Sequence, residues 1–148
     1  MNKIIGIVGI SGVGKTTFIR GLRAVQPFQH LSAGKLIKAQ RERESQQSQD
    51  HDDLRKLDID ENQCLLVEGF RNSLDTSQSL TLFDGHTVID TSKGLQPISS
   101  KVFKSLGAEA FIFLQDSPGI ISERRKADAM RLRPVISLDD IRNHQALA

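Results

Sequence analysis

The sequence predicts an α/β fold with a mostly parallel central sheet, built as one domain over residues 1–148. Two observations support this fold class. Short apolar segments alternate with segments whose apolar residues recur at helical spacing, as expected when crossover helices join parallel strands. A chain of 148 residues, 38% of them hydrophobic, suffices for one sheet with a single core but not for two independent lobes.

The first third of the chain contains two predicted strands and two predicted helices. Residues 4–8 form a β-branched apolar run bounded by glycines, which favours a strand buried on both faces. Apolar residues at helical spacing over residues 16–25 predict a helix, which Pro27 ends. Residues 28–31 are predicted to form a short second strand, after which Ser32 is the expected N-cap of another helix.

A polar segment over residues 41–63 interrupts this pattern. Residues 50–61 carry six acids against Arg55 and Lys56, which leaves a local net charge of −4. We interpret the segment as a solvated helix or a mobile flap. A helix is predicted next over residues 64–74, with Cys64 as a small buried residue.

Strands and helices alternate again in the second half. Two apolar runs, residues 80–83 and 110–114, predict strands that end close to Asp84 and Asp116. Residues 97–106 lie between them and predict a helix, because a proline opens this stretch and a glycine follows it.

Two further helices are predicted toward the C-terminus. Ser117 followed by Pro118 is typical of a helix start, and the apolar pattern continues this helix to Met130. Ser137 with Asp140 three residues later resembles a capping box, so a last helix is expected after it.

Composition excludes several classes of protein. The 20 basic and 18 acidic residues give a net charge of only +2, and Trp and Tyr are absent, so nucleic acid is not an expected partner. A single cysteine offers neither an internal disulfide nor a thiolate cluster for zinc. No apolar segment approaches the roughly 20 residues of a membrane span. We therefore predict a cytoplasmic protein without a membrane partner, and the sequence gives no signal for an oligomeric state.

The motif with the clearest chemistry is a P-loop over residues 9–16, which fits GxxxxGK followed by Thr. Glycines allow backbone N–H groups to turn toward phosphate oxygens, and the next helix presents its N-terminus to the same anion. Lys15 is expected to reach the β and γ phosphates of a nucleotide, and the Thr16 hydroxyl to bind Mg²⁺. The residues expected to bind the nucleotide are Gly12, Val13, Gly14, Lys15, Thr16 and Thr17.

Two aspartates compete for a second position near the metal. Asp84 and Asp116 each end an apolar strand, where a carboxylate could hold Mg²⁺ or its waters. We favour Asp84, because Gly85 and His86 follow it as a tight exit, whereas Asp116 could simply cap a helix. His86 is a candidate to orient an attacking group or contact phosphate, against the alternative of a solvated bystander.

A basic cluster occupies residues 124–133, where five cations oppose Asp128 and leave a local net charge of +4. Arg124 and Arg131 are seven residues apart and share a helical face, so their guanidinium groups could clamp transferring phosphates. The alternative is an exposed basic helix without a ligand. Because a phosphate site is already expected, we favour the catalytic interpretation for Lys15, Asp84, Arg124 and Arg131.

With these residues in order, the chain resembles the nucleoside monophosphate kinases, specifically the archaeal-type adenylate kinases and their nuclear eukaryotic relatives. The resemblance runs from Lys3 to about His144, and it rests on a series of short segments in the family's order. These segments are GISGVGKTT at 9–17, SAGKLIK at 32–38, LRKLD at 54–58, FDGH at 83–86, TSKGLQP at 91–97, the arginine-rich stretch 123–133 and IRNHQ at 141–145.

The resemblance implies a three-layer P-loop NTPase fold that uses ATP and Mg²⁺ and transfers phosphate between nucleotides. It implies an acceptor-binding helical insert at about 32–74, with Ser32, Gly34, Lys38 and His86 as acceptor-side residues. It implies a mobile lid at about 117–134, in which Arg125 and Arg133 join Arg124 and Arg131 over ATP. The family also continues into a further helix and edge strand, so this sheet is expected to lack its last strand.

Three other functions stay open at this point. A P-loop kinase could act on another small acceptor, such as a nucleoside or a sugar acid, and an ATPase of this type could serve as an assembly factor. Residues 116–119 also match the DxxG spacing of a GTPase switch, but the guanine-reading NKxD sequence is absent. ATP-dependent transfer to a nucleoside monophosphate is the preferred interpretation.

Overall fold

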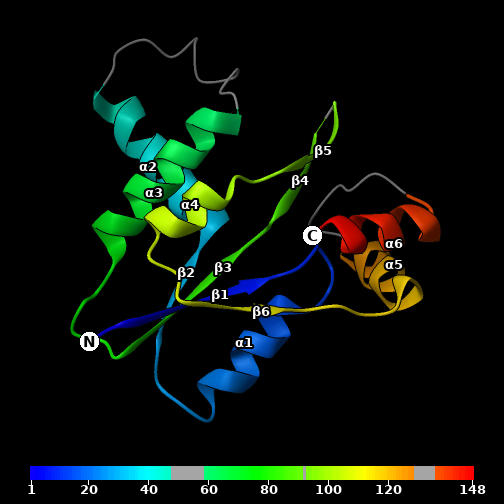
Figure 1. Ribbon diagram of the computed structural model, residues 1–148, viewed down its shortest axis with the longest axis horizontal. Coiled ribbons are helices and arrows are strands. Elements are labelled where there is room, and N and C mark those ends of the chain that lie inside the picture. The colour runs from blue at the N-terminus through cyan, green and yellow to red at the C-terminus, as the bar shows by residue number, and fades with distance from the viewer. Residues whose placement is uncertain (48–58, 92, 129–135) are drawn as a thin grey trace. The chain divides into compact units, whose positions relative to one another are not determined.

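The computed structural model describes residues 1–47, 59–91, 93–128 and 136–148, which form a mixed α/β fold (Figure 1). The chain divides into two compact units. The first unit comprises Met1–Gly6, Phe28–Gly85 and Ser99–Ala110. The second comprises Ile7–Pro27, His86–Ile98 and Phe111–Ala148.

The central sheet has four strands in the order β2-β3-β1-β6. Their bounds are Lys3–Val8 for β1, Gln29–Ser32 for β2, Leu80–Gly85 for β3 and Ala110–Phe113 for β6. Strands β2 and β3 run parallel, with Ser32 opposite Asp84 in the register. The mainly parallel sheet confirms the predicted fold class, and all four of these strands were predicted within about two residues.

Six helices are present among the described residues, and most agree with the sequence patterns. Their bounds are Lys15–Arg23 for α1, Ala33–Gln47 for α2, Ile59–Ser73 for α3, Ser100–Ser105 for α4, Pro118–Ala127 for α5 and Leu138–Leu147 for α6. Ser117 caps α5 and Ser137 with Asp140 forms the capping box of α6, so both predicted helix starts are confirmed. Residues 50–58 of the acidic segment and Met130 lie outside the described residues.

The segment after β3 differs from the prediction. An antiparallel hairpin of β4 (Val88–Thr91) and β5 (Gly94–Pro97) replaces the start of the expected helix, with Pro97 opposite Val88. The Thr91 hydroxyl donates to the Gly94 carbonyl at 2.8 Å, which closes the turn. Helix α4 therefore begins only at Ser100, where the side chain of Ser99 accepts from the Lys101 N–H.

The first unit has a core formed by side chains from β1, β2, β3, α2, α3 and α4. Phe70 and Phe83 meet edge to face in it, with ring centroids 5.7 Å apart. Its buried members are Ile4, Leu31, Leu36, Leu66, Phe70, Phe83 and Leu106. Burial of these side chains fixes α2 and α3 beside the parallel strands and places Ser32 at the start of α2.

Cys64 does not lie in this core, and the prediction that it is buried is wrong. The thiol is exposed. The buried large apolar side chains of α3 are those of Leu65, Leu66 and Phe70, whereas Cys64 shares its helical face with the exposed Glu68.

The second unit has its own smaller core, which supports the glycine-rich loop after β1. Ile10, Val13, Ile121 and Ile141 are buried together, with Leu114, Ile136 and Ala148 packed against them. Ile121 lies on α5 and Ile141 on α6, so both helices anchor the loop through apolar contacts. Within the described part of the chain, no helix has the length and apolar character needed to cross a membrane.

The turn between α3 and β3 is held by the Asp75 carboxylate. Its Oδ1 accepts from the Ser77 hydroxyl at 2.6 Å and from the Ser77 N–H at 2.9 Å, and Gln78 donates to Oδ2 at 3.4 Å. Hydrogen bonds from the hydroxyl and then the N–H of Ser77 lower the pKa of Asp75 below its usual value of 3.8.

We expect the Asp75→Asn variant to unfold at a lower temperature than the wild type at pH 7. A depressed pKa in the folded state gives stability that is present above the unfolded-state pKa and lost as the pH falls through the folded-state pKa. The difference in unfolding temperature between the wild type and the variant should therefore become smaller as the pH is lowered below about 3.8. Thermal unfolding followed by circular dichroism from pH 7 to pH 2.5 measures this, and a difference independent of pH would contradict it.

Candidate active site

The P-loop lies between β1 and α1, in the structural context that the motif requires. Gly14 is the N-cap of α1 and adopts the left-handed conformation, with φ at 104°. No side chain caps this helix, so the N–H groups of its first turn remain available to an anion. The loop and the helix start can thus bind phosphate through backbone donors.

Lys15 extends along this loop. Its ammonium group donates to the Gly9 carbonyl at 2.7 Å and lies 3.3 Å from the Ile10 carbonyl. Thr16 and Thr17 follow in the first turn of α1, and both are exposed. Three of the predicted nucleotide-binding side chains therefore gather at one helix start.

His86 also contacts the loop. Its Nδ1 lies 3.1 Å from the Gly9 carbonyl oxygen, the same oxygen that Lys15 reaches. Because a carbonyl only accepts, this contact requires a proton on Nδ1. The structure thus gives His86 a defined partner on the P-loop, and its predicted role on the acceptor side stays a prediction.

Two arginines of α5 approach the P-loop through its carbonyl groups. Arg124 Nη1 donates to the Val13 carbonyl at 3.0 Å, and Arg125 Nε donates to the Ser11 carbonyl at 2.8 Å. A Cβ atom added at Gly12 would lie 3.0 Å from the Arg125 Cγ, and one added at Gly14 would lie 3.4 Å from the Arg124 Nη1. Both glycines thus leave room for the arginines.

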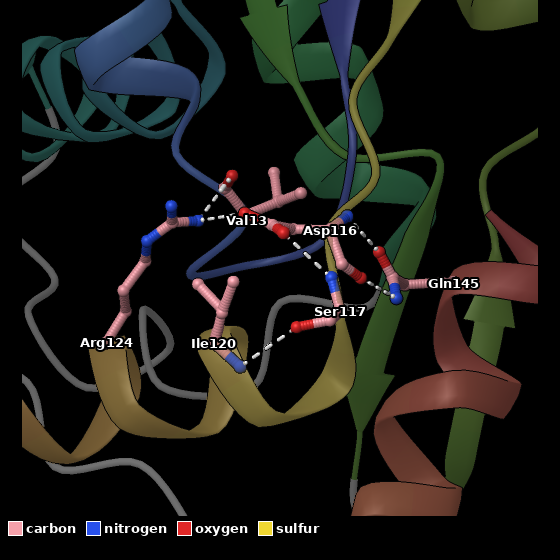
Figure 2. Close-up of polar contacts among 6 residues, drawn as sticks. All are labelled: Val13, Asp116, Ser117, Ile120, Arg124 and Gln145. Carbon is pink, nitrogen blue, oxygen red and sulfur yellow. Dashed lines mark hydrogen bonds and ion pairs between the residues drawn. The ribbon is translucent and has the colours of Figure 1, made fainter.

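Asp116 proves to be the partner of Arg124. Arg124 Nη1 donates to Asp116 Oδ2 at 2.8 Å, and the other carboxylate oxygen accepts from the Ser117 N–H at 2.8 Å (Figure 2). The N-cap of α5 is Ser117, whose hydroxyl accepts from the Ile120 N–H, so the alternative that Asp116 caps the helix is wrong. The carboxylate instead joins the start of α5 to an arginine on its second turn.

Gln145 on α6 is a residue of this cluster that the sequence did not indicate. Its Nε2 donates to the Asp116 carbonyl at 2.8 Å, and its Oε1 accepts from the Asp116 N–H at 3.0 Å (Figure 2). A neutral amide 29 residues away leaves no charge or spacing signal. The only available cue was a polar residue at a position of α6 that the helical pattern predicts to be buried.

Apart from His86, the predicted acceptor-side residues belong to the other unit. Ser32 ends β2 and pairs in register with Asp84 on β3. Asp84 lies within β3 rather than after it, and its Oδ2 is 3.7 Å from His30 Nε2. Gly34 and Lys38 follow on α2, where both are exposed, and Lys38 lies 4.0 Å from Glu42. An exposed pair at this distance contributes little, so the Lys38 ammonium stays accessible.

Residues 8–142 match the family model described as an AAA domain. The chain belongs to this family. It also resembles curated adenylate kinases from Thermoplasma volcanium and Pyrococcus abyssi. The first is 29% identical over 142 residues and the second 28% over 151. These matches cover 95% and 99% of this chain and 77% and 76% of those proteins.

Solved kinase structures share the fold of this AAA domain. A gluconokinase from Sinorhizobium meliloti matches with a TM-score of 0.54 and 14% identity, over 99% of this chain and 74% of its own. A sugar kinase from Janibacter matches with a TM-score of 0.57 and 14% identity, over 99% of this chain and 78% of its own. At such identities the likeness concerns the fold alone.

This AAA domain is a P-loop phosphotransferase, as the family resemblance implied. The predicted basic lid is only partly described, because Arg131 and Arg133 lie outside the described residues. The shared helical face of Arg124 and Arg131 and the contacts expected between these arginines and ATP stay predictions. What the structure adds is the position of Arg124 and Arg125 against backbone carbonyls of the P-loop.

Proposed function

We propose that this enzyme transfers the γ-phosphoryl group of ATP to a nucleoside monophosphate, as an adenylate kinase does when it converts ATP and AMP into two ADP. The observation that carries the phosphoryl-transfer part is the uncapped start of α1 at Gly14, with Lys15 as the next residue. The acceptor part is supported by the curated relatives, which are named adenylate kinase and align over most of the chain.

The nucleotide side of the reaction needs alignment and charge neutralisation more than covalent chemistry. The N–H groups of the loop and of the first turn of α1 would hold the phosphates, and the Lys15 ammonium would leave the Gly9 carbonyl to reach the β and γ phosphates. These groups act as fixed donors around charge that shifts during transfer.

Mg²⁺ fits the donors available on this chain. When bound to nucleotide it is held mainly by phosphate oxygens and water, so one or two protein oxygens suffice. Within the described residues no group of three or more His, Cys, Asp or Glu could hold a metal ion. The exposed Thr16 hydroxyl is the oxygen proposed to bind it, with Asp84 as the carboxylate on the metal side. The ion would neutralise charge on the phosphates.

The acceptor would bind beside β2 and α2. Ser32, Gly34 and Lys38 lie at the end of the strand and on the first two turns of the helix. The exposed Lys38 ammonium can neutralise the phosphate of a monophosphate acceptor; an uncharged sugar would not use this charge, whereas the carboxylate of a sugar acid would. Sugar-type acceptors remain the main rival, since two of the solved structures with this fold are sugar kinases.

A panel of acceptors tests the proposal. The wild-type protein is incubated with Mg-ATP and AMP, CMP, UMP, GMP, gluconate or no acceptor, and products are separated by ion-exchange chromatography. We expect at least one monophosphate to be consumed and its own diphosphate to form, in addition to the ADP that ATP leaves; for AMP this means two ADP for each AMP consumed. In the Lys38→Ala variant the KM for that acceptor should rise about tenfold, the effect of a lost charge-assisted contact, with kcat less affected. The matched variant Lys35→Ala removes another exposed lysine of α2 and should change neither constant.

Each alternative predicts a different result. Phosphorylated gluconate together with ADP from the donor, and no diphosphate of any added monophosphate, would make a sugar acid the acceptor in place of the monophosphate. Hydrolysis at the same slow rate with and without every acceptor would favour an ATPase that acts as an assembly factor. A nucleotide switch predicts competition by GTP, and not by ATP, for a bound fluorescent nucleotide. Equal KM values for the Lys38→Ala and Lys35→Ala variants would remove Lys38 from the acceptor site.

A further inference from the structure

A series of hydrogen bonds connects the C-terminal helix to the P-loop through four residues: Gln145, Asp116, Arg124 and Val13 (Figure 2). We propose that Gln145 and Asp116 are positioning residues. They act through Arg124, which orients the Gly14 N–H toward the phosphate that the P-loop binds. The proposal rests on the proposed function only in assuming that the loop binds ATP, and it does not depend on the acceptor.

Gln145 fixes the backbone of Asp116. The residue is 8% exposed, and its amide both donates to the Asp116 carbonyl and accepts from the Asp116 N–H. A planar amide carries a donor and an acceptor side by side, so it can satisfy both backbone groups at once. The two hydrogen bonds hold the turn between β6 and α5 in one conformation.

Asp116 then fixes Arg124. One carboxylate oxygen accepts from the Ser117 N–H, which sets the plane of the carboxylate, and the other accepts from Arg124 Nη1, each at 2.8 Å. The arginine side chain is 46% exposed and would otherwise sample many rotamers. A charge-assisted contact to a carboxylate that is itself held in place selects one of these rotamers.

Arg124 in turn orients a peptide of the P-loop. The nitrogen that contacts Asp116 also donates to the Val13 carbonyl at 3.0 Å. In a trans peptide the carbonyl and the following N–H point in opposite directions, so a guanidinium on the Val13 carbonyl directs the Gly14 N–H away from α5. A cation on the carbonyl also polarises the peptide, which strengthens its N–H as a donor. The result is a preorganised donor for an anion.

Arg125 makes a similar contact with the P-loop carbonyl two residues before Val13. Its Nε donates to the Ser11 carbonyl at 2.8 Å, which by the same geometry directs the Gly12 N–H away from α5. Arg125 is less exposed than Arg124, and its side chain packs against Gly12. The inference concerns Arg124, because its contacts with Asp116 and thus with Gln145 are the ones that extend to α6.

A rival explanation gives Asp116 the opposite effect. If Arg124 must leave Asp116 to contact the nucleotide phosphates, the ion pair withholds it from ATP. Removing the carboxylate would then strengthen ATP binding rather than weaken it. The two explanations therefore predict opposite signs for one measurable change.

The test is a set of mutant cycles read out by isothermal titration of Mg-ATP without any acceptor. The variants are Asp116→Ala, Gln145→Met and Arg124→Ala, and each of the first two combined with the third. Asp139→Ala is the matched control, because it removes an exposed carboxylate that pairs with Arg142 on α6. Thermal unfolding of every variant reports stability separately. Gln145→Met keeps the length of the side chain and removes its amide, and Asp116→Asn substitutes for Asp116→Ala if the latter does not fold.

We expect Asp116→Ala and Gln145→Met each to raise the Kd for Mg-ATP about fivefold, and Arg124→Ala about tenfold. Residues that act only through Arg124 have no further effect once it is gone, so both double variants should bind ATP like Arg124→Ala alone. The Asp139→Ala control should bind like the wild type. A purely structural role predicts instead that the Kd rises by the same factor with and without Arg124.

Tighter ATP binding by Asp116→Ala, unchanged binding by both single variants, or the same fold-change in the Arg124→Ala background would each overturn the inference. Failure of the proposed function has a separate signature. A wild-type protein that binds Mg-ATP but phosphorylates no monophosphate removes the proposed acceptor and leaves the cycles fully interpretable. A wild-type protein that binds no ATP removes the proposed function and this inference together.

Discussion

Replacing Lys15 by alanine is expected to lower the rate of phosphoryl transfer by about 30-fold or more, with the fold retained. The loss corresponds to at least ~2 kcal/mol of transition-state stabilisation, the scale found when one electrostatic donor is removed from a preorganised site. The Lys15 ammonium donates to P-loop carbonyls near the start of α1, a helix that has no side-chain cap.

The fold should survive because the carbonyls of Gly9 and Ile10 lose a partly exposed donor, and the buried core of this unit does not include Lys15. Activity, Mg-ATP affinity and thermal unfolding are measured on the same preparation. Lys104→Ala is the matched control, since it removes an exposed lysine in the last turn of α4. Wild-type activity in the Lys15→Ala variant would contradict the P-loop assignment, and an equal loss in the Lys104→Ala variant would show that the effect is one of general charge.

The four strands of the central sheet and the P-loop were predictable because their signals are local. The β-branched run of residues 4–8 gave β1 within one residue, and the glycine pattern that follows gave the loop and the start of α1. Capping serines gave the starts of α5 and α6, since an N-cap needs only a side chain and a nearby N–H. Features that depend on a few consecutive residues are thus the ones that the sequence determines.

The hairpin of β4 and β5 was missed because proline has two common uses. Pro97 suggested the first turn of a helix, where proline is favoured, but it ends an exposed strand, where the missing N–H is also tolerated. The true cap, Ser99, lies two residues later. The burial prediction for Cys64 was wrong for a different reason. Cysteine is a residue type that favours burial, but Leu66 and Phe70 determine which face of α3 is buried, and Cys64 lies on another face.

The sequence indicated which charged residues belong to the candidate site, but not which atoms they contact. The clustering of cations and their spacing predicted a phosphate ligand for Arg124, and the family resemblance implied one for Arg125. Their actual partners are the carbonyl groups of Val13 and Ser11, and backbone acceptors leave no mark in a sequence. Gln145 was invisible for the same reason, since it binds the backbone of Asp116.

The Gly9→Ala substitution is expected to destabilise the protein strongly, by about 3 kcal/mol, the range of overpacking in a closely packed site. Leu114 donates its N–H to the Val8 carbonyl at 2.9 Å, so the two backbones already lie side by side where β1 ends. A Cβ atom on Gly9 would meet the Leu114 carbonyl oxygen at 2.7 Å and Val13 Cγ1 at 3.1 Å. The φ angle of 150° adds strain that only glycine avoids.

The added Cβ would clash with the Leu114 carbonyl oxygen, which is a backbone atom. The clash can be relieved only if β1 and the chain after β6 separate or if the P-loop moves. Either shift displaces the Gly9 carbonyl that accepts from Lys15 and contacts His86, so nucleotide affinity should fall together with stability. The matched control is Gly21→Ala on α1, where nothing lies within 4 Å of an added Cβ. That variant should gain roughly 0.5–1 kcal/mol, because alanine replaces glycine within a helix. Chemical denaturation of both variants measures the contrast, and equal stability of the two would show that the backbone at Gly9 has more room than its contacts indicate.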